Sequence, residues 1–594
     1  MKKVYFLFLI IFMALVFSTS LFAQAQISPS DIDKAIKAQD DVVAKEQNRL
    51  KAEEDKSNLE TAQKPFPKVE FEELALPEVT TGNIPSFNIR VIIFEGANHL
   101  SDFTQLDLKA PFLNTYMTIN DINTLVRNIT NKYIEAGYIT TRVYIPKQNL
   151  KEGVLRLKII EGIIEEIKGE GLTDLQIFMA FPFMKGGVLN LRTIEQGLDQ
   201  VNRLNSKYAT VKLVPSQKTL GASIVVIQCK DVQNSRILGS IRYDNFSEQR
   251  FTAFPNSYDL AKDNLFGILD IWKLNYGQQF QNQHRFNNTL ALNLSVPLGF
   301  FTLTGSYSVF DYLNLINGTE RNFLASGKTQ TNKVQLDATV FRNQTAKTNI
   351  YTNLIAKDTV SFIEDTKSDV GSRKLVMLSV GMNQSLNTDF GFFSINFFYT
   401  QGLRNLGASL DTPGLPTITP KAQFKKLSLD TTWVKMQDFF SLPLKLQSNL
   451  VAQYSPSTLY SSERISIGDF YTVRGYPGIY QGDWGFYSRN EVSYAFPNIL
   501  SSLINLDAID LIRYITSAQV QMFEAVDGGF VYQTGGTALN GKEGIVYLTS
   551  VSAGFRYPTK YLNLEITYSA PLWATANIER YFGGLFYLSG TITL

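Results

Sequence analysis

The sequence predicts a membrane β-barrel of about 16 antiparallel strands, preceded by two small α+β modules and an N-terminal helix. Three observations support this prediction. Apolar and polar side chains alternate over residues 233–594, one order of strands and helices occurs twice over residues 87–232, and residues 26–63 form a polar segment of helical character. The formal net charge of +2 in 594 residues does not indicate a nucleic-acid partner.

The alternation in the C-terminal part is the pattern of strands that separate lipid from water. Leu290, Leu292 and Leu294 share one face of a strand, and Asn293 and Ser295 share the other. A membrane strand needs about 9–11 residues, and allowing about 20–25 residues for each strand with its connection gives about 16 strands. A barrel of that size encloses water. A soluble β-sandwich would show the same alternation and is the alternative at this point.

Residues 1–25 have the features of a secretory signal peptide. Lys2 and Lys3 precede an apolar run that ends at Phe17, and Ala23-Gln24-Ala25 offers a cleavage site of small residues. The apolar run is shorter than the roughly 20 residues of a spanning helix. We therefore expect export from the cytoplasm.

Residues 26–63 are rich in Asp, Glu, Lys and Gln, and the later half of this segment is polar nearly all round. A helix of this kind either lies in water or contacts polar walls. Two interpretations follow, a solvated helical spacer or a helix inside a water-filled pore. Prolines then indicate an extended linker over residues 64–86.

Residues 87–161 and 162–232 are predicted to be two copies of one β-α-α-β-β unit of about 70 residues. In such a unit the helices cover one face of a small sheet, and the strand edges stay accessible. An accessible edge can bind an extended peptide as an added strand. The expected elements are strands at 89–94, 141–145 and 154–160 with helices at 100–108 and 119–135, then strands at 163–167, 209–214 and 222–230 with helices at 172–181 and 191–207.

An arginine motif interrupts the array of strands near its end. The motif is Val473-Arg474-Gly475-Tyr476, and Gly482-Asp483 and Asn490-Glu491 follow it. A charged residue between a glycine and aromatics, in a region otherwise suited to lipid contact, indicates a loop folded back into the barrel. An arginine that is removed from bulk water needs a carboxylate, which balances its charge and accepts hydrogen bonds from its N–H groups.

This organisation resembles that of the outer-membrane transporters of two-partner secretion. The two modules resemble polypeptide-transport-associated (POTRA) domains, and the resemblance covers essentially the whole mature chain. The motif Val473-Arg474-Gly475-Tyr476 matches the family's signature at the tip of the loop that folds into the barrel. Residues Gly482, Asp483, Asn490 and Glu491 match the stretch after the signature, and Asp263-Asn264, Leu265-Phe266-Gly267 and Asp270 resemble the family's early-barrel sequence.

The resemblance also implies a partner for Arg474. In the family an aspartate in a Phe-x-Asp-x-Gly motif on a late strand holds the arginine, and Asp527 with Gly529 fits the end of this motif here. Ala525 occupies the position of the motif's phenylalanine, so Glu524 is the alternative partner. An arginine that lines a wet pore without a fixed partner is a third possibility.

The function implied by the resemblance is export of an unfolded partner protein, adhesin-like or haemolysin-like, from the periplasm of a Gram-negative bacterium to the cell surface. The POTRA domains would bind the partner, hypothetically within residues 163–231, and the barrel-assembly machinery would insert the barrel into the outer membrane. Leu594 stands where the family has a terminal aromatic residue. No catalytic residue, cofactor or metal is expected, since the chain has one cysteine and two histidines. The alternatives are a barrel-assembly or insertion factor of the same superfamily, a passive porin and a surface adhesin.

Overall fold

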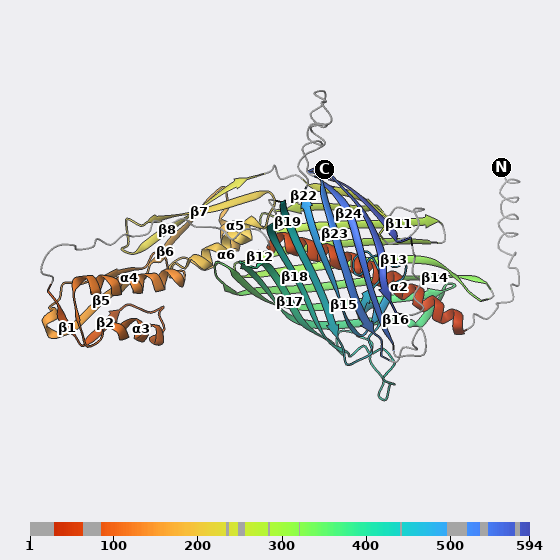
Figure 1. Cartoon of the computed structure of the whole chain (residues 1–594), viewed down its shortest axis with the longest axis horizontal. Helices are drawn as coiled ribbons and strands as arrows, with labels where there is room; N and C mark the ends of the chain where they lie inside the picture. Colours follow the sequence, from red (N-terminus) through yellow and green to blue (C-terminus); the bar gives the residue numbers. More distant parts are fainter. Residues whose placement is uncertain are drawn as a thin grey trace, which may run out of the picture.

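The computed structural model describes residues 29–62, 85–232, 237–246, 256–282, 285–319, 321–439, 442–495, 520–534, 544–575 and 583–593. The expected signal peptide, nearly all of the expected linker and Leu594 lie outside the described residues. Two small modules lie at one end of a large barrel, and helix α2 (Pro29–Ala62) runs through the barrel (Figure 1). None of the described helices is long and apolar enough to span a membrane.

Sixteen antiparallel strands form the closed barrel, as the sequence predicts. Their outward faces carry exposed apolar side chains such as Leu290, Leu292 and Phe301, because successive residues of a strand point to opposite faces. The strands are β9 (Leu238–Asp244), β10 (Asn256–Asp263), β11 (Ile271–Asn282), β12 (Arg285–Leu298), β13 (Phe301–Asn317), β14 (Asn322–Arg342), β15 (Ala346–Ile363), β16 (Thr366–Thr388), β17 (Gly391–Gly402), β18 (Lys425–Phe439), β19 (Leu442–Tyr454), β22 (Trp484–Ala495), β23 (Gln521–Tyr532), β24 (Ile545–Pro558), β25 (Leu562–Ala574) and β26 (Leu585–Thr593).

The barrel closes where its first strand, β9, meets its last, β26. Five residue pairs join these two strands, from Ser589 opposite Asp244 to Thr593 opposite Ser240. The pairing of β13 with β14 is much longer and runs from Phe301 to Asn317 on β13. The pairing that closes the barrel, which we call the seam, is therefore shorter than the pairing of β13 with β14.

The two modules share one sheet pattern, in which a central strand pairs in parallel with one neighbour and antiparallel with the other. The sheet orders are β2-β5-β4 and β6-β8-β7. The first module contains β1 (Phe87–Ile89), β2 (Val91–Glu95), α3 (Asp102–Lys109), β3 (Thr115–Met117), α4 (Ile119–Glu135), β4 (Arg142–Tyr144) and β5 (Val154–Ile160). The second contains β6 (Ile163–Glu170), α5 (Asp174–Ala180), α6 (Leu191–Asn202), β7 (Lys207–Pro215) and β8 (Ala222–Asp231).

Local details of the modules differ from the sequence-based expectation. The single strand expected at 89–94 is two strands, because β1 leaves the main sheet and pairs with the short strand β3. Helix α6 ends at Asn202, whereas a helix to residue 207 was expected. The side chain of Asn202 bonds both to the backbone N–H and to the carbonyl of Ala209 on β7, so it joins the helix end to the following strand.

Helix α6 of the second module is docked on the rim of the barrel. The Gln200 amide donates to the carbonyl oxygen of Gly299 at 2.7 Å, in the turn between β12 and β13. The guanidinium of Arg203 donates to the carbonyl oxygen of Ser295 at 2.8 Å, and Asp199 pairs with Arg342 at the end of β14. The second module is thus held on the turns that follow β12 and β14.

Candidate functional site

Residues 455–483, between β19 and β22, fold back into the barrel, and we call them the inward loop. Their two arms pair as a short hairpin of β20 (Ile465–Ile467) and β21 (Tyr480–Gly482), with the 3-10 turn η3 (Ser461–Glu463) before it. At the tip, Gly468 and Gly475 have positive φ angles of 103° and 86°, which glycine adopts without a steric penalty. Apolar side chains of the loop pack against the inner wall in one buried cluster of Ile465, Ile467, Val473, Tyr476, Tyr487, Val531, Leu548 and Ala574.

The structure pairs Arg474 with Asp527 of β23. The Nε atom of Arg474 donates to one carboxylate oxygen at 2.6 Å and Nη2 donates to the other at 2.9 Å. Both side chains are almost completely buried. Such a bidentate pair fixes direction as well as distance, and removing one partner leaves an uncompensated buried charge, at a cost of about 3–5 kcal/mol. Glu524, the alternative partner, is exposed on the opposite face of β23.

The predicted neighbours of Arg474 also hold the loop to the wall. The backbone N–H of Gly475 donates to the hydroxyl of Tyr587 at 3.2 Å. The hydroxyl of Tyr476 lies 2.6 Å from the carbonyl oxygen of Thr549 and 2.7 Å from that of Trp573. A register shift between β24 and β25 begins at Thr549, so Tyr476 binds carbonyls at an interruption of the wall's own pairing.

Gly482 and Asp483 fix the end of the loop. Asp483 is fully buried and accepts hydrogen bonds from the backbone N–H groups of Leu459 and Thr534, both at 2.8 Å, and from Arg464 at 3.2 Å. A Cβ atom added to Gly482 would lie 2.6 Å from backbone atoms of Tyr532. Glycine is therefore required for this close approach of β21 to β23.

Two predicted residues lie elsewhere. Asn490 is exposed on the outward face of β22 and accepts a hydrogen bond from Ser448 at 2.7 Å. Glu491 points inward and forms an ion pair with Arg556, whose guanidinium lies 3.9 Å from the centre of the Phe523 ring. Sequence reasoning missed Arg556. The sequence does contain a signal for it, because Arg556 is the one charged residue of β24 and this strand follows the strand of Asp527.

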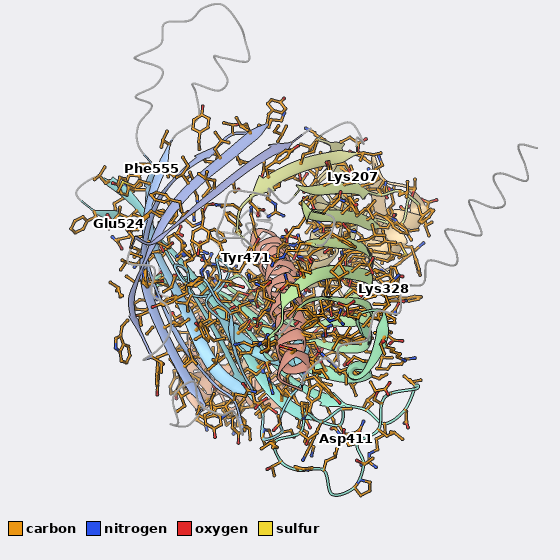
Figure 2. The ribbon with its side chains drawn as sticks, turned by 90° about the vertical axis from the view of Figure 1, so that its right-hand side faces the viewer. Lys207, Lys328, Asp411, Tyr471, Glu524 and Phe555 are labelled. Atoms are coloured by element: carbon orange, nitrogen blue, oxygen red, sulfur yellow. The ribbon has the colours of Figure 1, made fainter. Side chains whose placement is uncertain are left out.

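Helix α2 occupies the lumen beside the inward loop, as Figure 2 shows with Tyr471 next to the helix. The amide of Asn48 donates to Asp469 at 2.6 Å and to Ser466 at 2.9 Å. Asp40 contacts the loop twice, by accepting from the hydroxyl of Ser461 through its carboxylate and from the side chain of Gln481 through its carbonyl. The structure thus has the second of the two arrangements considered from sequence, a helix inside the pore.

The helix also forms ion pairs with the barrel wall. Lys51 pairs with Asp430 at 2.9 Å, and Glu53 pairs with Arg242 of β9. The first half of the helix also makes apolar contacts with the wall, where Ala35 packs against Phe323 and Val43 against Phe310. The later half of the helix, which is polar nearly all round, therefore contacts polar groups of the wall.

Within the described part of the chain, no group of three or more His, Cys, Asp or Glu residues could hold a metal ion. His99 instead lies 2.7 Å from Glu161, and Cys229 is a half-buried residue of β8. The site consists of a buried arginine pair, a hairpin and a polar helix, whose contacts attach the inward loop to the barrel wall and the helix to both.

A family model described as haemolysin secretion/activation protein ShlB/FhaC/HecB matches residues 221–557. The chain belongs to this family. Two further models match the modules, a POTRA domain of ShlB type over residues 87–162 and a POTRA domain over residues 149–215. We therefore name the first module POTRA 1 and the second POTRA 2.

Named relatives of this haemolysin secretion/activation family member are transporters. The outer membrane transporter CdiB of Dickeya dadantii (strain 3937) is 32% identical over 497 residues, which cover 82% of this chain and 84% of the relative. The hemolysin transporter protein ShlB of Serratia marcescens is 29% identical over 379 residues, covering 64% and 67%. The solved structure of CdiB from Escherichia coli has 26% sequence identity and a TM-score of 0.78, and the match covers 96% of this chain and 100% of that one.

Membership of the haemolysin secretion/activation family places the barrel in the outer membrane and the POTRA domains in the periplasm. The protein is an outer-membrane transporter of two-partner secretion. The turns that contact POTRA 2 therefore lie on the periplasmic side, and the inward loop enters the lumen from the extracellular side.

Proposed function

We propose that this transporter carries an unfolded, adhesin-like or haemolysin-like partner protein through the barrel lumen after helix α2 has left it. The observation that carries the proposal is the set of polar contacts between α2 and the lumen, including Asn48 with Asp469 and Lys51 with Asp430. Groups of this kind can exchange their protein partners for water, so their net contribution to stability is modest. A helix held in this way is suited to reversible release, and the protein acts as a conduit with no catalytic step.

Arg474 has a positioning role in this mechanism. Its pair with Asp527 is buried against the wall, so it touches the loop and the barrel and not the transported chain. The pair keeps the hairpin against one side of the lumen and keeps the path beside it open when α2 departs. Residues Val473, Gly475, Tyr476, Gly482 and Asp483 support the same placement through the contacts described above.

The partner protein first binds in the periplasm within residues 163–231 of POTRA 2. Support comes from the sheet order, in which β7 pairs with β8 alone among the described strands. An edge of this kind can accept an extended segment as an added strand. We also propose that residues 1–25 are the signal peptide, that residues 64–86 link α2 to POTRA 1, and that the barrel-assembly machinery inserts the barrel.

Single-channel conductance in planar bilayers tests the role of the helix. The mature chain is compared with a variant that lacks residues 27–63. We expect larger and steadier conductance after the deletion, because α2 fills the lumen. Equal conductance of the two proteins would contradict a pore closed by its own helix. Heat-modifiable migration in gels, which reports a folded barrel, is the control for both proteins.

A further inference from the structure

Five large apolar side chains are exposed where POTRA 2 meets the barrel, and we call them the apolar foot. They come from α5, from the segment after it, and from the turn between β10 and β11. The exposed fractions are 50% for Leu175, 44% for Phe178, 89% for Phe183, 53% for Leu265 and 65% for Phe266. Phe178 and Phe183 contact each other edge to face, with ring centres 5.5 Å apart.

The turn between β10 and β11 presents its part of the foot to the lipid side of the barrel. Phe266 packs edge to face on Trp272, with ring centres 5.6 Å apart. Trp272 pairs with Leu294, and it shares the outward face of β11 with the exposed Tyr276. The opposite face of this strand points into the lumen, because Asn275 accepts a hydrogen bond from Arg49 of α2. Phe266 is therefore continuous with the lipid-facing surface.

Helix α5 touches the same part of the rim. Gln176 donates to the side chain of Asn264 at 3.1 Å, and the carbonyl oxygen of Met179 accepts from the backbone N–H of Gly299 at 2.8 Å. Gly299 lies in the turn between Leu298 and Phe301, which are both exposed on the outward face of the barrel. The foot residues of α5 are thus adjacent to the periplasmic end of the apolar band.

Helix α6 lies on the other side of this rim. Its Gln200 and Arg203 reach Thr302 and the side chain of Ser295, which alternate with the outward residues and so point into the lumen. Leu175 and Phe178 are on the face of α5 away from the shared core of the two helices, whereas Ala180 and Ile177 contribute to that core. The exposed face of α5 consequently looks away from the lumen.

We propose that the apolar foot inserts into the periplasmic leaflet of the outer membrane and anchors POTRA 2 to the lipid. Aromatic and aliphatic side chains next to a membrane-spanning surface are suited to the interfacial region. An exposed apolar patch continuous with that surface is covered when lipid surrounds the barrel. Phe183 also has a positive φ of 58°, a conformation that is unfavourable for a non-glycine residue, and its side chain is 89% exposed.

The foot gives POTRA 2 a second attachment besides the polar contacts of α6. Those contacts hold the domain to the barrel, and the foot holds it to the bilayer. The orientation of the partner-binding edge relative to the membrane plane would then depend on lipid as well as on protein.

A fluorescent probe in the full-length transporter tests this proposal. The natural cysteine is first removed by Cys229→Ser, and Phe183→Cys is then labelled with an environment-sensitive dye. The matched control is Leu220→Cys, which is 81% exposed in the turn between β7 and β8, next to Gly221, where an added Cβ atom would lie 2.7 Å from Ile160 of POTRA 1. Both proteins are placed in phospholipid nanodiscs with and without a nitroxide-labelled phospholipid.

We expect the nitroxide lipid to quench the probe at position 183 at least twofold more strongly than the probe at position 220, together with a blue shift at 183 only. Equal quenching at the two positions would overturn the proposal. Phe266→Cys is a second probe of the foot on the barrel itself. If 266 is quenched and 183 is not, the bilayer contact ends at the barrel turn, and anchoring of POTRA 2 by lipid is wrong.

Discussion

Asn48 of the lumen helix donates a hydrogen bond to Asp469 of the inward loop, with 2.6 Å between the two atoms. The same amide bonds to Ser466 at 2.9 Å, and Asp469 also accepts from the hydroxyl of Thr472 at 2.8 Å. The helix is therefore attached directly to the segment that carries the arginine motif. Asn48 couples the helix to the loop, together with the contacts of Asp40 with Ser461 and Gln481.

Asn48→Ala should increase spontaneous opening of the channel. The substitution removes hydrogen bonds to Ser466 and Asp469, each worth about 0.5–1.5 kcal/mol net, so the open probability should rise several-fold in single-channel recordings. Gln47→Ala, which removes an amide at the adjacent position of α2, is the control. The same opening frequency in both variants would show that Asn48 does not hold the helix.

Arg474→Ala should strongly reduce secretion of the partner while the barrel still assembles. The substitution leaves the carboxylate of Asp527 buried without its cation, which costs about 3–5 kcal/mol at the loop. Arg474→Lys should also impair secretion, because an ammonium group cannot reproduce the bidentate fork. Secreted partner and surface protease sensitivity of the loop are measured together. Normal secretion by Arg474→Ala would remove the positioning role proposed for this residue.

Tyr476→Phe should loosen the tip of the loop without unfolding the barrel. The hydroxyl meets two carbonyl oxygens where the β24–β25 pairing shifts register, and its loss removes hydrogen bonding worth about 0.5–1.5 kcal/mol. Hydrogen exchange of residues 468–479 should become faster. Tyr547→Phe, at an exposed position of β24, should leave that exchange unchanged.

Gly482→Ala and Gly478→Ala form a matched pair in the inward loop. A Cβ atom at 482 would lie 2.6 Å from the backbone of Tyr532, whereas a Cβ at 478 would have no heavy atom nearer than 3.6 Å. We expect Gly482→Ala to lower the thermal transition of the folded barrel and Gly478→Ala to leave it nearly unchanged. Equal transition temperatures of the two variants would show that the backbone at Tyr532 can move to accommodate the added Cβ atom without loss of stability.

POTRA 1 should lose stability in acid through Glu161. Burial by itself would raise the pKa of this carboxyl, but hydrogen bonds from His99 and from the hydroxyl of Tyr133 hold its pKa below the ordinary value. A depressed folded-state pKa gives stability that is present above the unfolded value of about 4.3 and is lost as the pH falls through the folded value. Far-ultraviolet circular dichroism of thermal unfolding should show this loss, and Glu161→Gln should show a smaller dependence on pH in that range.

The wall of the barrel was predictable from sequence because alternation along a strand depends on neighbouring residues only. The pairs across the lumen, Asn48 with Asp469 and Glu53 with Arg242, were not predictable from sequence. Their positions along the barrel axis depend on the stagger of all the strands, which a local pattern does not contain. Asp527 was inferred through the resemblance to a family motif, and its inward direction follows the same alternation that turns Glu524 outward. The position of α2 could not be predicted from sequence, because the polar side chains of a helix can form hydrogen bonds equally well in water and in a water-filled lumen.

The short seam between β9 and β26 is supported from inside the barrel. The ring of Phe470, at the tip of the inward loop, stacks on Phe246 just after β9 and lies 4.9 Å from the ring of Tyr587 on β26. Glu53 of the helix pairs with Arg242 on β9, so the helix and the inward loop both contact the strands that form this seam. In the proposed open state, after α2 has left, this seam loses the ion pair of Glu53 with Arg242 and keeps the aromatic contacts of Phe470, so the closing join of the wall has less internal support than in the closed state.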